Sequence, residues 1–407
     1  MRNVDAAGLG IGDDHPPRIM GVLNVSEESP YDPSVYDEPG EAAAYVDEEL
    51  IGEGADIVDV GLESANKELD VLSADQELER LDVAVETMES VSGDAVWSIE
   101  TRYHEVADEA LSRGFDMVND VCGFADPEMP RVCREHDVAV AKMASPPDLE
   151  RPGAVDGVDA VYDALANNGL TDRTILDPAF GRWSETATLE DDRDTFRRLR
   201  EFRGYGRPLL ISINRKTFLR ELAGRDTEGA LPVSLAATAM AVERGAHVIR
   251  THDVAETRDA AVIGAEFTRD RVRRSGEPSV EELDVTTARE ARRHLERLNA
   301  DPERATDAVV RVYELSGLTA EERGTLRAAA ADGAGRFVPA GPVAEAETAA
   351  TDGSGTDPDA GVTDHGPEVG SGILIATPAD LERIETSFSE VSDALRDVIE
   401  DIRHDSK

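Results

Sequence analysis

Acidic, amide and cationic side chains recur directly after short apolar runs through the first two thirds of the chain. Asp59, Asp177 and Lys216 are the most informative, because each lies at the end of an apolar run or shortly after one and could be buried there. Comparable positions are held by Asn24, Glu63, Glu100, Asn119, Met143, Asn214, Arg215, Arg250, His252 and Asp253. Carboxylates and amides that meet in one pocket suit a flat heterocycle with N–H donors and ring acceptors. Cationic side chains beside them suit a phosphate or diphosphate.

Lysine is rare in this sequence, and its positions are therefore informative. It occurs only at Lys67, Lys142, Lys216 and Lys407, while arginine supplies the other cations. A chain that otherwise avoids lysine is expected to need a lysine that it keeps at the end of an apolar run. We therefore predict that Lys216 contacts the ligand.

Acidic residues are dispersed along the whole chain. The 407 residues include 86 Asp and Glu against 42 Lys and Arg, which gives a formal net charge of −44. Dispersed carboxylates with little lysine keep a protein hydrated in concentrated salt, where charge repulsion is screened within about 3 Å at 1 M. A field of this sign repels nucleic acid and anionic membranes. The composition predicts a halophilic protein that binds neither nucleic acid nor membrane.

Cysteine use and hydropathy indicate the compartment. Cys122 and Cys133 make a poor disulfide framework and are expected to be free thiols. The sequence has no signal-peptide pattern and no apolar run near the ~20 residues of a membrane span. These observations favour a cytoplasmic protein.

Eight short apolar runs must position the polar side chains. They are Ile19–Leu23, Asp56–Val60, Val96–Ile99, Met117–Asn119, Val138–Ala141, Thr174–Leu176, Leu209–Ile213 and Val248–Arg250. Helix-period segments separate them at Glu41–Glu53, Ala74–Val91, Tyr103–Arg113, Arg193–Phe202, Val233–Arg244 and Ala255–Arg269. This alternation predicts parallel strands, and eight repeats favour a closed (β/α)8 TIM barrel over a doubly wound open sheet. In such a barrel the carboxyl ends of all strands meet at one face, so the polar side chains would converge there.

The chain after the barrel follows a different pattern. We predict an N-terminal extension at 1–17, the barrel at 18–272, a helical appendage at 273–340, a disordered acidic linker at 341–370 and a strand-helix segment at 371–407. The predicted helices are Thr286–Leu298, Ala305–Leu315, Thr319–Ala330 and Ala379–Ile399, and the predicted strands are Arg336–Pro339 and Gly372–Ala376. The fold class is α/β, a TIM barrel with a small C-terminal helical or α/β appendage.

The strand-end motifs resemble those of the dihydropteroate synthase family, in order and at its spacing, over residues 18 to 268. Met20–Val25 is similar to the opening signature, and Gly52–Gly61 with Glu63-Ser64 is similar to the second. The later matches are Ser98–Thr101, Asn119–Val121 with Gly123, Leu176–Pro178, Arg215–Phe218 and Arg250–Val254. The sequence is therefore identified as a divergent, haloarchaeal-type member of this family of pterin-binding barrels.

The resemblance implies a transferase of folate biosynthesis that joins 6-hydroxymethyl-dihydropterin pyrophosphate to p-aminobenzoate and releases pyrophosphate. The pterin would be held by Asp59, Glu100, Asn119, Met143, Asp177 and Lys216. Pyrophosphate would be held by Asn24, Arg250 and His252, with Asn24 also touching Mg²⁺. The catalytic residues would be Asp59, Lys216 and Arg250. The resemblance also suggests a homodimer.

Departures from the family pattern gather at the end that would bind the acceptor. The family's Ser-Thr-Arg-Pro-Gly is replaced by the segment 64–68, a Phe by Pro30 and a Ser by Asn214. The pterin end is nearly intact, with Glu100 in place of an Asp as its main exception. We therefore assign Ala65, Asn66 and Asn214 to an altered acceptor groove. A methyltransferase-like pterin barrel and a non-catalytic pterin-binding protein are the alternatives.

Overall fold

The computed structural model describes residues 2–26, 34–36, 38–63, 71–181, 188–274, 276, 278–340, 369–387 and 392–404. The chain divides into two compact units, Met1–Asp284 and Val285–Lys407. Among the described residues, no helix is long and apolar enough to cross a membrane.

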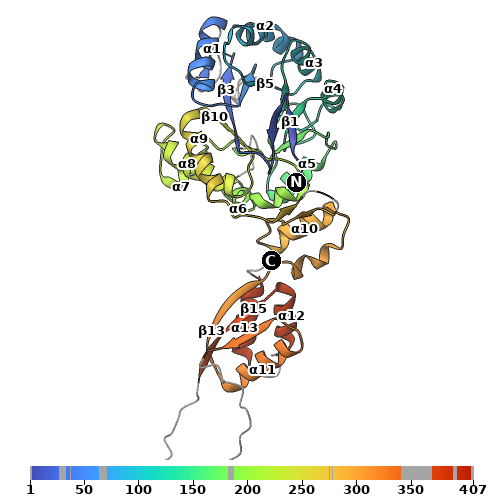
Figure 1. Ribbon diagram of the computed structural model, residues 1–407, viewed down its shortest axis with the longest axis vertical. Coiled ribbons are helices and arrows are strands. Elements are labelled where there is room, and N and C mark those ends of the chain that lie inside the picture. Colours follow the sequence, from blue (N-terminus) through green and yellow to red (C-terminus); the bar gives the residue numbers. More distant parts are fainter. Residues whose placement is uncertain are drawn as a thin grey trace, which may run out of the picture. The chain divides into compact units, whose positions relative to one another are not determined.

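The first unit is built on eight parallel strands (Figure 1). They are β3 (Arg18–Asn24), β4 (Ile57–Gly61), β5 (Val96–Thr101), β6 (Met117–Asp120), β7 (Ala139–Met143), β8 (Thr174–Asp177), β9 (Leu210–Ile211) and β10 (Val248–Thr251). Their order is β8-β7-β6-β5-β4-β3-β10-β9, and a parallel bridge between Leu176 and Leu209 joins the two ends. The predicted TIM barrel is therefore confirmed, with each predicted apolar run on its strand.

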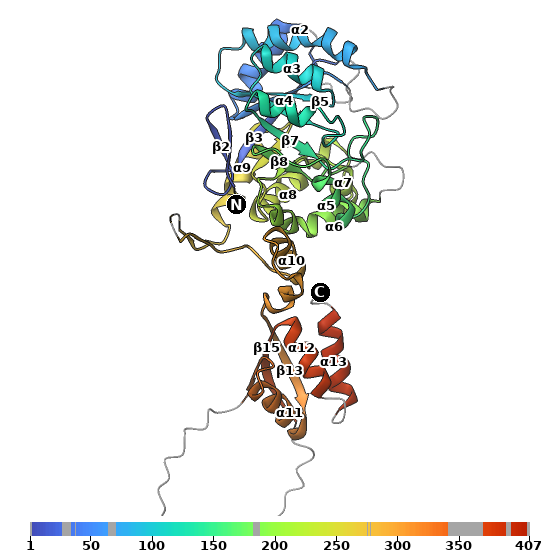
Figure 2. The same ribbon diagram turned by 90° about the vertical axis from the view of Figure 1, so that its right-hand side faces the viewer.

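Helices follow most strands and surround the barrel (Figures 1 and 2). They are α1 (Pro39–Tyr45), continued by the π-helix η2 (Val46–Ile51), α2 (Ala74–Ser90), α3 (His104–Ser112), α4 (Met129–Glu135), α5 (Val158–Ala166), α6 (Leu189–Arg197), the 3₁₀ helix η3 (Leu199–Tyr205), α7 (Thr217–Ala223), the 3₁₀ turn η4 (Glu228–Ala230), α8 (Leu231–Glu243) and α9 (Val254–Glu266). Capping explains some of the starts: Ser73 and Gln76 form a capping box at α2. The sequence did not predict α4, α5 or α7, which have 7, 9 and 7 residues.

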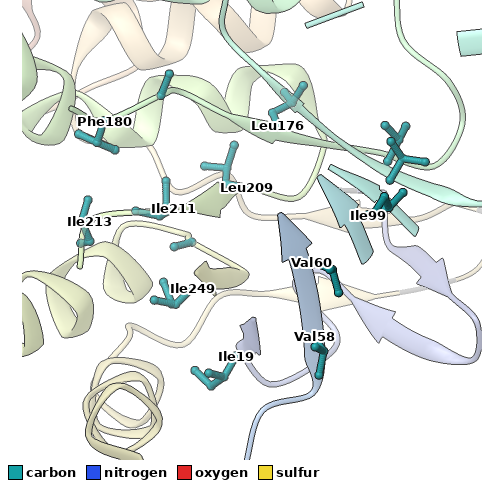
Figure 3. Close-up of a cluster of buried hydrophobic side chains, with 14 of the residues drawn as sticks. Ile19, Val58, Val60, Ile99, Leu176, Phe180, Leu209, Ile211, Ile213 and Ile249 are labelled. Carbon is teal, nitrogen blue, oxygen red and sulfur yellow. The ribbon is translucent and has the colours of Figure 1, made fainter. Parts of the chain in front are cut away.

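The two faces of the barrel strands supply two separate apolar layers. Side chains such as Ile19, Val58, Val60 and Ile99 belong to one buried cluster with helix residues such as Leu50 and Leu81. Figure 3 shows these four strand residues within that cluster. The inward layer includes Met20, Ile57, Met117, Ala139, Ile175, Leu210 and Val248, and it packs with Val4, Ala6 and Ile11. Those last three residues belong to the antiparallel hairpin of β1 (Val4–Ala6) and β2 (Leu9–Ile11). Because the inward residues lie near strand starts, this hairpin packs at the amino-terminal end of the barrel.

A buried ion cluster holds the segment after the hairpin to the barrel. The Asp13 carboxylate is 3% exposed and accepts hydrogen bonds from Arg203 Nη2 at 3.0 Å, from His247 Nε2 at 3.1 Å and from Arg271 Nη2 at 3.1 Å. Burial alone would raise the pKa of Asp13, but the His247 hydrogen bond and the two guanidinium charges outweigh it and lower that pKa. The N-terminal segment is thereby tied into the first unit, which also contains β11 (Arg273–Arg274) and β12 (Val280–Glu281).

The second unit has its own core. Its elements are α10 (Ala288–Arg297), the 3₁₀ helix η5 (Pro302–Asp307), β13 (Arg311–Leu318), α11 (Ala320–Ala331), β14 (Arg336–Pro339), β15 (Gly370–Ala376), α12 (Pro378–Ser387) and α13 (Asp393–His404). The strands form an antiparallel sheet in the order β13-β15-β14. Leu315, Phe337 and Leu374 cover one face of this sheet and pack with Leu326, Leu381, Ile384 and Ile399 of helices α11, α12 and α13.

Two secondary-structure predictions for this region are wrong. The segment Ala305–Leu315 is not a helix, because it is divided between η5 and strand β13. Val312 and Tyr313 are β-branched and aromatic residues that favour a strand, and pairing with β15 decides the outcome. The predicted helix Ala379–Ile399 is two helices, α12 and α13, on either side of residues 388–391, which are not described. Most of the predicted linker, residues 341–368, also lies outside the described residues.

Candidate active site

A cavity opens at the carboxyl ends of the barrel strands. Its walls combine five acidic or amide side chains with three cationic ones and a few apolar residues. The lining residues are Glu63, Glu77, Glu100, Thr101, Arg102, Asn119, Val121, Met143, Pro152, Gly153, Asp177, Ala179, Phe180, Gly181, Ser212, Lys216 and Arg250. Five of the six residues that we assigned to pterin binding are among them, and Asp59 lies directly behind them.

Asp59 is at the centre of a buried network. One of its oxygens, Oδ2, accepts hydrogen bonds from Asn119 Nδ2 at 2.9 Å and from Arg250 Nε at 2.7 Å. Arg250 also donates from Nη2 to Glu100 Oε2 at 2.5 Å. The other Asp59 oxygen, Oδ1, is buried and has no hydrogen-bond partner among the described residues. A buried carboxylate oxygen without a donor is costly, so this atom calls for an N–H group from a ligand or a water molecule.

Asp177 and Lys216 lie on the opposite side of the cavity from β5, at the ends of β8 and β9. Asp177 Oδ1 accepts from the backbone N–H of Ala179 at 2.7 Å. Burial raises the pKa of Asp177 to about 6, against the opposing effects of that hydrogen bond and of Lys216. Burial and the nearby Arg250 charge lower the pKa of Lys216. Neither residue forms an ion pair within 4 Å among the described residues, so both keep hydrogen-bonding capacity for a ligand.

The backbone around these two residues is shaped to bring them together. Gly181 has φ +73°, and a Cβ at this position would lie 2.9 Å from Lys216 Cδ and 3.2 Å from its Nζ. Only glycine therefore allows the lysine to pack this closely. Ala179 and Arg215 have φ of +60° and +50°, a region that is costly for residues with a Cβ. Such strain at two strand ends is typical of functional sites.

Two charged side chains of the cavity, Glu77 and Arg102, were not singled out from the sequence. Glu77 is 1% exposed, lies in the first turn of α2 and accepts from Thr101 Oγ1 at 2.5 Å. Burial raises its pKa to about 7. Arg102 is 2% exposed, pairs with Glu63 and donates to the carbonyl of Leu149 at 2.7 Å. Arg102 directly follows β5, so its place at a strand end was an available signal. Glu77 is not at the end of an apolar run, and its available signal was an acidic residue at a core-facing position of an amphipathic helix.

The residues assigned to pyrophosphate are only partly brought together. Arg250 lines the cavity, whereas Asn24 and His252 are not among the lining residues. Asn24 Nδ2 donates to Ser34 Oγ at 2.9 Å, and its Oδ1 faces Gly61, where a Cβ would lie 3.0 Å away. Burial, with the Arg250 charge next, lowers the pKa of His252 to about 3, so its imidazole is neutral near pH 7.

Of the three residues assigned to the acceptor groove, the structure describes only Asn214. Asn214 Nδ2 donates to Asp253 Oδ2 at 2.8 Å, and Arg215 binds the same carboxylate with two hydrogen bonds of 2.8 Å. Asn214 is thus engaged beside the cavity and does not line it. Ala65 and Asn66 lie outside the described residues, as does Pro30.

Comparison with known proteins gives the class of this barrel. Residues 20–252 match the family model described as pterin binding enzyme. A probable bifunctional folylpolyglutamate synthase/dihydropteroate synthase of Halobacterium salinarum is 34% identical over 263 residues, which are 62% of this chain and 31% of that protein. The dihydropteroate synthase of Bacillus subtilis is 30% identical over 242 residues, 58% of this chain and 83% of that protein. The chain thus spans about a third of its bifunctional relative.

Solved structures show the same relationship. A dihydropteroate synthase of Coxiella burnetii in complex with pteroic acid aligns with a TM-score of 0.55 at 28% identity, over 65% of this chain and 98% of that one. A dihydropteroate synthase of Thermus thermophilus in complex with 4-aminobenzoate aligns with a TM-score of 0.54 at 30% identity, over 65% and 100% of the two chains. The fold and the site define a pterin-binding (β/α)8 barrel. The chain belongs to the pterin-binding enzyme family, as a homologue of the dihydropteroate synthases.

Proposed function

We propose that the protein is a dihydropteroate synthase, a transferase that condenses 6-hydroxymethyl-dihydropterin pyrophosphate with p-aminobenzoate or a related arylamine and releases pyrophosphate. One observation carries the proposal: Glu100, Asn119, Asp177, Lys216 and Arg250 come from five different strand ends and line one cavity, with Asp59 behind them. A flat ring with N–H donors on one edge and acceptors on another fits such a lining. The names of the Bacillus and Halobacterium relatives support the same reaction.

The pterin would be recognised by groups on both sides of the cavity. Asp59 Oδ1 and the Asp177 carboxylate accept from ring N–H groups, Lys216 donates to ring acceptors, and Met143 packs on the ring. These carboxylates also stabilise the positive charge that develops on the pterin methylene as its C–O bond breaks. Asp59, Lys216 and Arg250 are therefore the residues to which we assign catalysis.

The departing pyrophosphate takes the bonding electron pair and needs positive charge and donors. Arg250 supplies a guanidinium, and the neutral His252 imidazole can donate one hydrogen bond. Asn24 fits Mg²⁺ as a single hard ligand, because its amide N–H is engaged by Ser34 and its Oδ1 is left to bind a cation. When bound, Mg²⁺ would neutralise charge on the pyrophosphate oxygens. The amine nitrogen of the acceptor forms the new C–N bond and loses a proton.

The finer assignments rest on composition and on the departures from the family pattern. We assign Asn214, with Ala65 and Asn66, to an altered acceptor groove, so the acceptor can differ from p-aminobenzoate. The net charge of −44 supports a salt-rich cytoplasm as the site of action.

Pyrophosphate release tests the proposal. The full chain in molar KCl and Mg²⁺ is incubated with the dihydropterin pyrophosphate, with and without p-aminobenzoate, and both pyrophosphate and the pterin product are measured. We expect acceptor-dependent release and a pteroate product by mass spectrometry. Arg250→Lys should remove most of the activity, whereas Arg258→Lys, at an arginine of helix α9, should leave it unchanged. Bound pterin without any pyrophosphate release would refute the reaction and favour a non-catalytic pterin-binding protein.

A further inference from the structure

Three neighbouring strand ends place a glycine between two side chains that carry oxygen atoms. Asn24 at the end of β3 is the Cα partner of Gly61 on β4, and Gly61 is in turn the Cα partner of Glu100 on β5. Residues that are paired in this way across a sheet point to the same face. Asn24 and Glu100 therefore flank Gly61, and the missing side chain of the glycine leaves room between them.

Oxygen atoms border the space that a side chain at Gly61 would occupy. Beyond its two chain neighbours, the three described heavy atoms nearest to a Cβ at this position are all oxygens. They are Asn24 Oδ1 at 3.0 Å, the Glu63 carbonyl oxygen at 3.9 Å and Glu100 Oε1 at 4.0 Å, which we call the oxygen cage. Amide, carbonyl and carboxylate oxygens are the ligands that hard cations such as Mg²⁺ and Ca²⁺ take in proteins.

The two side-chain oxygens of the oxygen cage keep their capacity to bind a cation. Asn24 donates from Nδ2 to Ser34 Oγ, and Glu100 accepts from Arg250 at its other oxygen, Oε2. Neither Asn24 Oδ1 nor Glu100 Oε1 accepts a hydrogen bond from a described residue. The carboxylates of Asp59 and Glu100 share a single guanidinium, that of Arg250. This group therefore has an excess negative charge beside the oxygen cage, which a cation would neutralise.

We propose that Glu100 and the Glu63 carbonyl join Asn24 in a binding site for a hard divalent cation of the Mg²⁺ class, and that the protein binds this cation before any pyrophosphate is present. Mg²⁺ keeps several waters and is usually held by one or two carboxylates, so this small set of oxygens suits it. Glu100 is one methylene longer than the aspartate of the family pattern, so one of its oxygens can serve the cation while the other stays on Arg250. The cation and Arg250 then meet the pyrophosphate together, a role that rests on the proposed function.

Mn²⁺ binding to the full chain, without pterin or acceptor, tests the proposal. Free Mn²⁺ is measured by electron paramagnetic resonance during a titration in molar KCl, where salt screens weak binding to surface carboxylates. We expect a tight site that Mg²⁺ competes for. Gly61→Ala should abolish this site, because the added Cβ lies 3.0 Å from Asn24 Oδ1 and fills the space between the oxygens. The matched control is Gly324→Ala on α11, where a Cβ meets no atom within 4 Å, and it should bind Mn²⁺ as the parent does.

Substitutions at Glu100 test its part in the site. Glu100→Gln removes the charge and Glu100→Asp withdraws the carboxylate by one methylene, so each should raise the Mn²⁺ dissociation constant about tenfold or more. Glu79→Gln, at an exposed position of α2, should leave that constant unchanged. Circular dichroism of each variant in the same buffer confirms that the fold is retained.

The outcomes separate the cation site from the proposed reaction. A parent chain that binds no Mn²⁺ without pyrophosphate would overturn the cation site, even if Mg²⁺-dependent pyrophosphate release were then observed with the substrates. Mn²⁺ binding that survives both Gly61→Ala and Glu100→Gln would overturn it equally, because the ion would lie elsewhere. Mn²⁺ binding that these substitutions remove, in a protein that releases no pyrophosphate, would support the cation site and refute the reaction.

Discussion

The two ends of the barrel each contain buried charged residues, and the groups differ in how fully they are paired. At the amino-terminal end, both oxygens of Asp13 accept hydrogen bonds from Arg203, and Oδ1 also accepts from His247 and Arg271. At the carboxyl end, Asp59 Oδ1 lacks a partner among the described residues, and Lys216 forms no ion pair there. Buried charged residues are thus well paired at the amino-terminal end of the barrel, whereas those at the carboxyl end keep hydrogen-bonding capacity for a ligand.

The pKa values follow this difference in pairing. The pKa of Asp13 is lowered by its hydrogen bond to His247 and by the two guanidinium charges, so that carboxylate is ionised near pH 7. Burial raises the pKa of Asp177 to about 6 and that of Glu77 to about 7, because few donors or cations compensate them. Incomplete pairing at the carboxyl end therefore costs stability, which a bound ligand can recover.

Removing the charge of Asp13 should have the largest effect on stability. Asp13→Asn leaves Arg203 and Arg271 buried without their carboxylate, which typically costs about 3–5 kcal/mol. Urea unfolding in molar KCl measures the change. Asp14→Asn is the matched control, because the neighbouring Asp14 is 56% exposed and its ion pair with Arg273 contributes little. A decrease of less than about 1 kcal/mol in the free energy of unfolding for Asp13→Asn would show that the cluster contributes little to the stability of the barrel.

Lys216 tests the carboxyl end of the barrel, where the buried charged groups are incompletely paired. Lys216→Ala should weaken dihydropterin binding by about 2–4 kcal/mol while the fold survives, because the ligand loses a charged donor and the core loses no volume. Lys216→Arg should not restore binding, since a guanidinium fork does not fit the compact space beside Gly181. Calorimetric titration and a thermal melt in high salt measure the two effects.

Lys142→Ala is the control for this experiment, because Lys142 is also a rare lysine at a strand end. Its Nζ donates to the carbonyls of Leu165 and Gly169 at 3.0 and 2.9 Å, and to that of Asn167. We therefore expect Lys142→Ala to lower the melting temperature and to leave pterin affinity per folded molecule unchanged. Unchanged pterin binding in Lys216→Ala would place the pocket on other strand ends.

The two lysines also show what the sequence could and could not predict. Apolar runs and their polar ends predict the barrel and the convergence of Asp59, Asn119, Asp177 and Arg250, because strand polarity alone puts such residues at one face. Whether a side chain at that face points into the barrel or outward depends on its position along the chain, because successive strand residues point to opposite sides. Lys142 points outward to the end of α5, and Lys216 borders the cavity.

Contacts between distant segments account for what could not be predicted. Glu77 reaches the cavity because α2 packs its first turn beside the end of β5, a relationship that no local pattern contains. The strand β13 is formed by pairing with β15, more than fifty residues later, and this pairing is not contained in the local pattern from which Ala305–Leu315 was predicted to be a helix. The position of Asp13 under the barrel likewise depends on residues about 190 to 260 positions away.

Glu77 offers a smaller test, in the pH dependence of stability. Its pKa is about 7 in the folded protein against 4.5 for an unperturbed glutamate, so between these values the folded state binds the extra proton. Stability from this group is therefore present below pH 4.5 and lost as the pH rises toward 7. Glu77→Gln, which stays neutral, should be about 1–3 kcal/mol more stable than the parent at pH 8 and similar to it at pH 4.5. Glu79→Gln, at an exposed position of the same helix, should follow the parent at every pH. Urea unfolding in molar KCl across this pH range measures the difference. If the free energy of unfolding of Glu77→Gln and of the parent had the same pH dependence, the burial of Glu77 would be compensated by its neighbours. The charged groups at the carboxyl end would then be as fully paired as those of the Asp13 cluster.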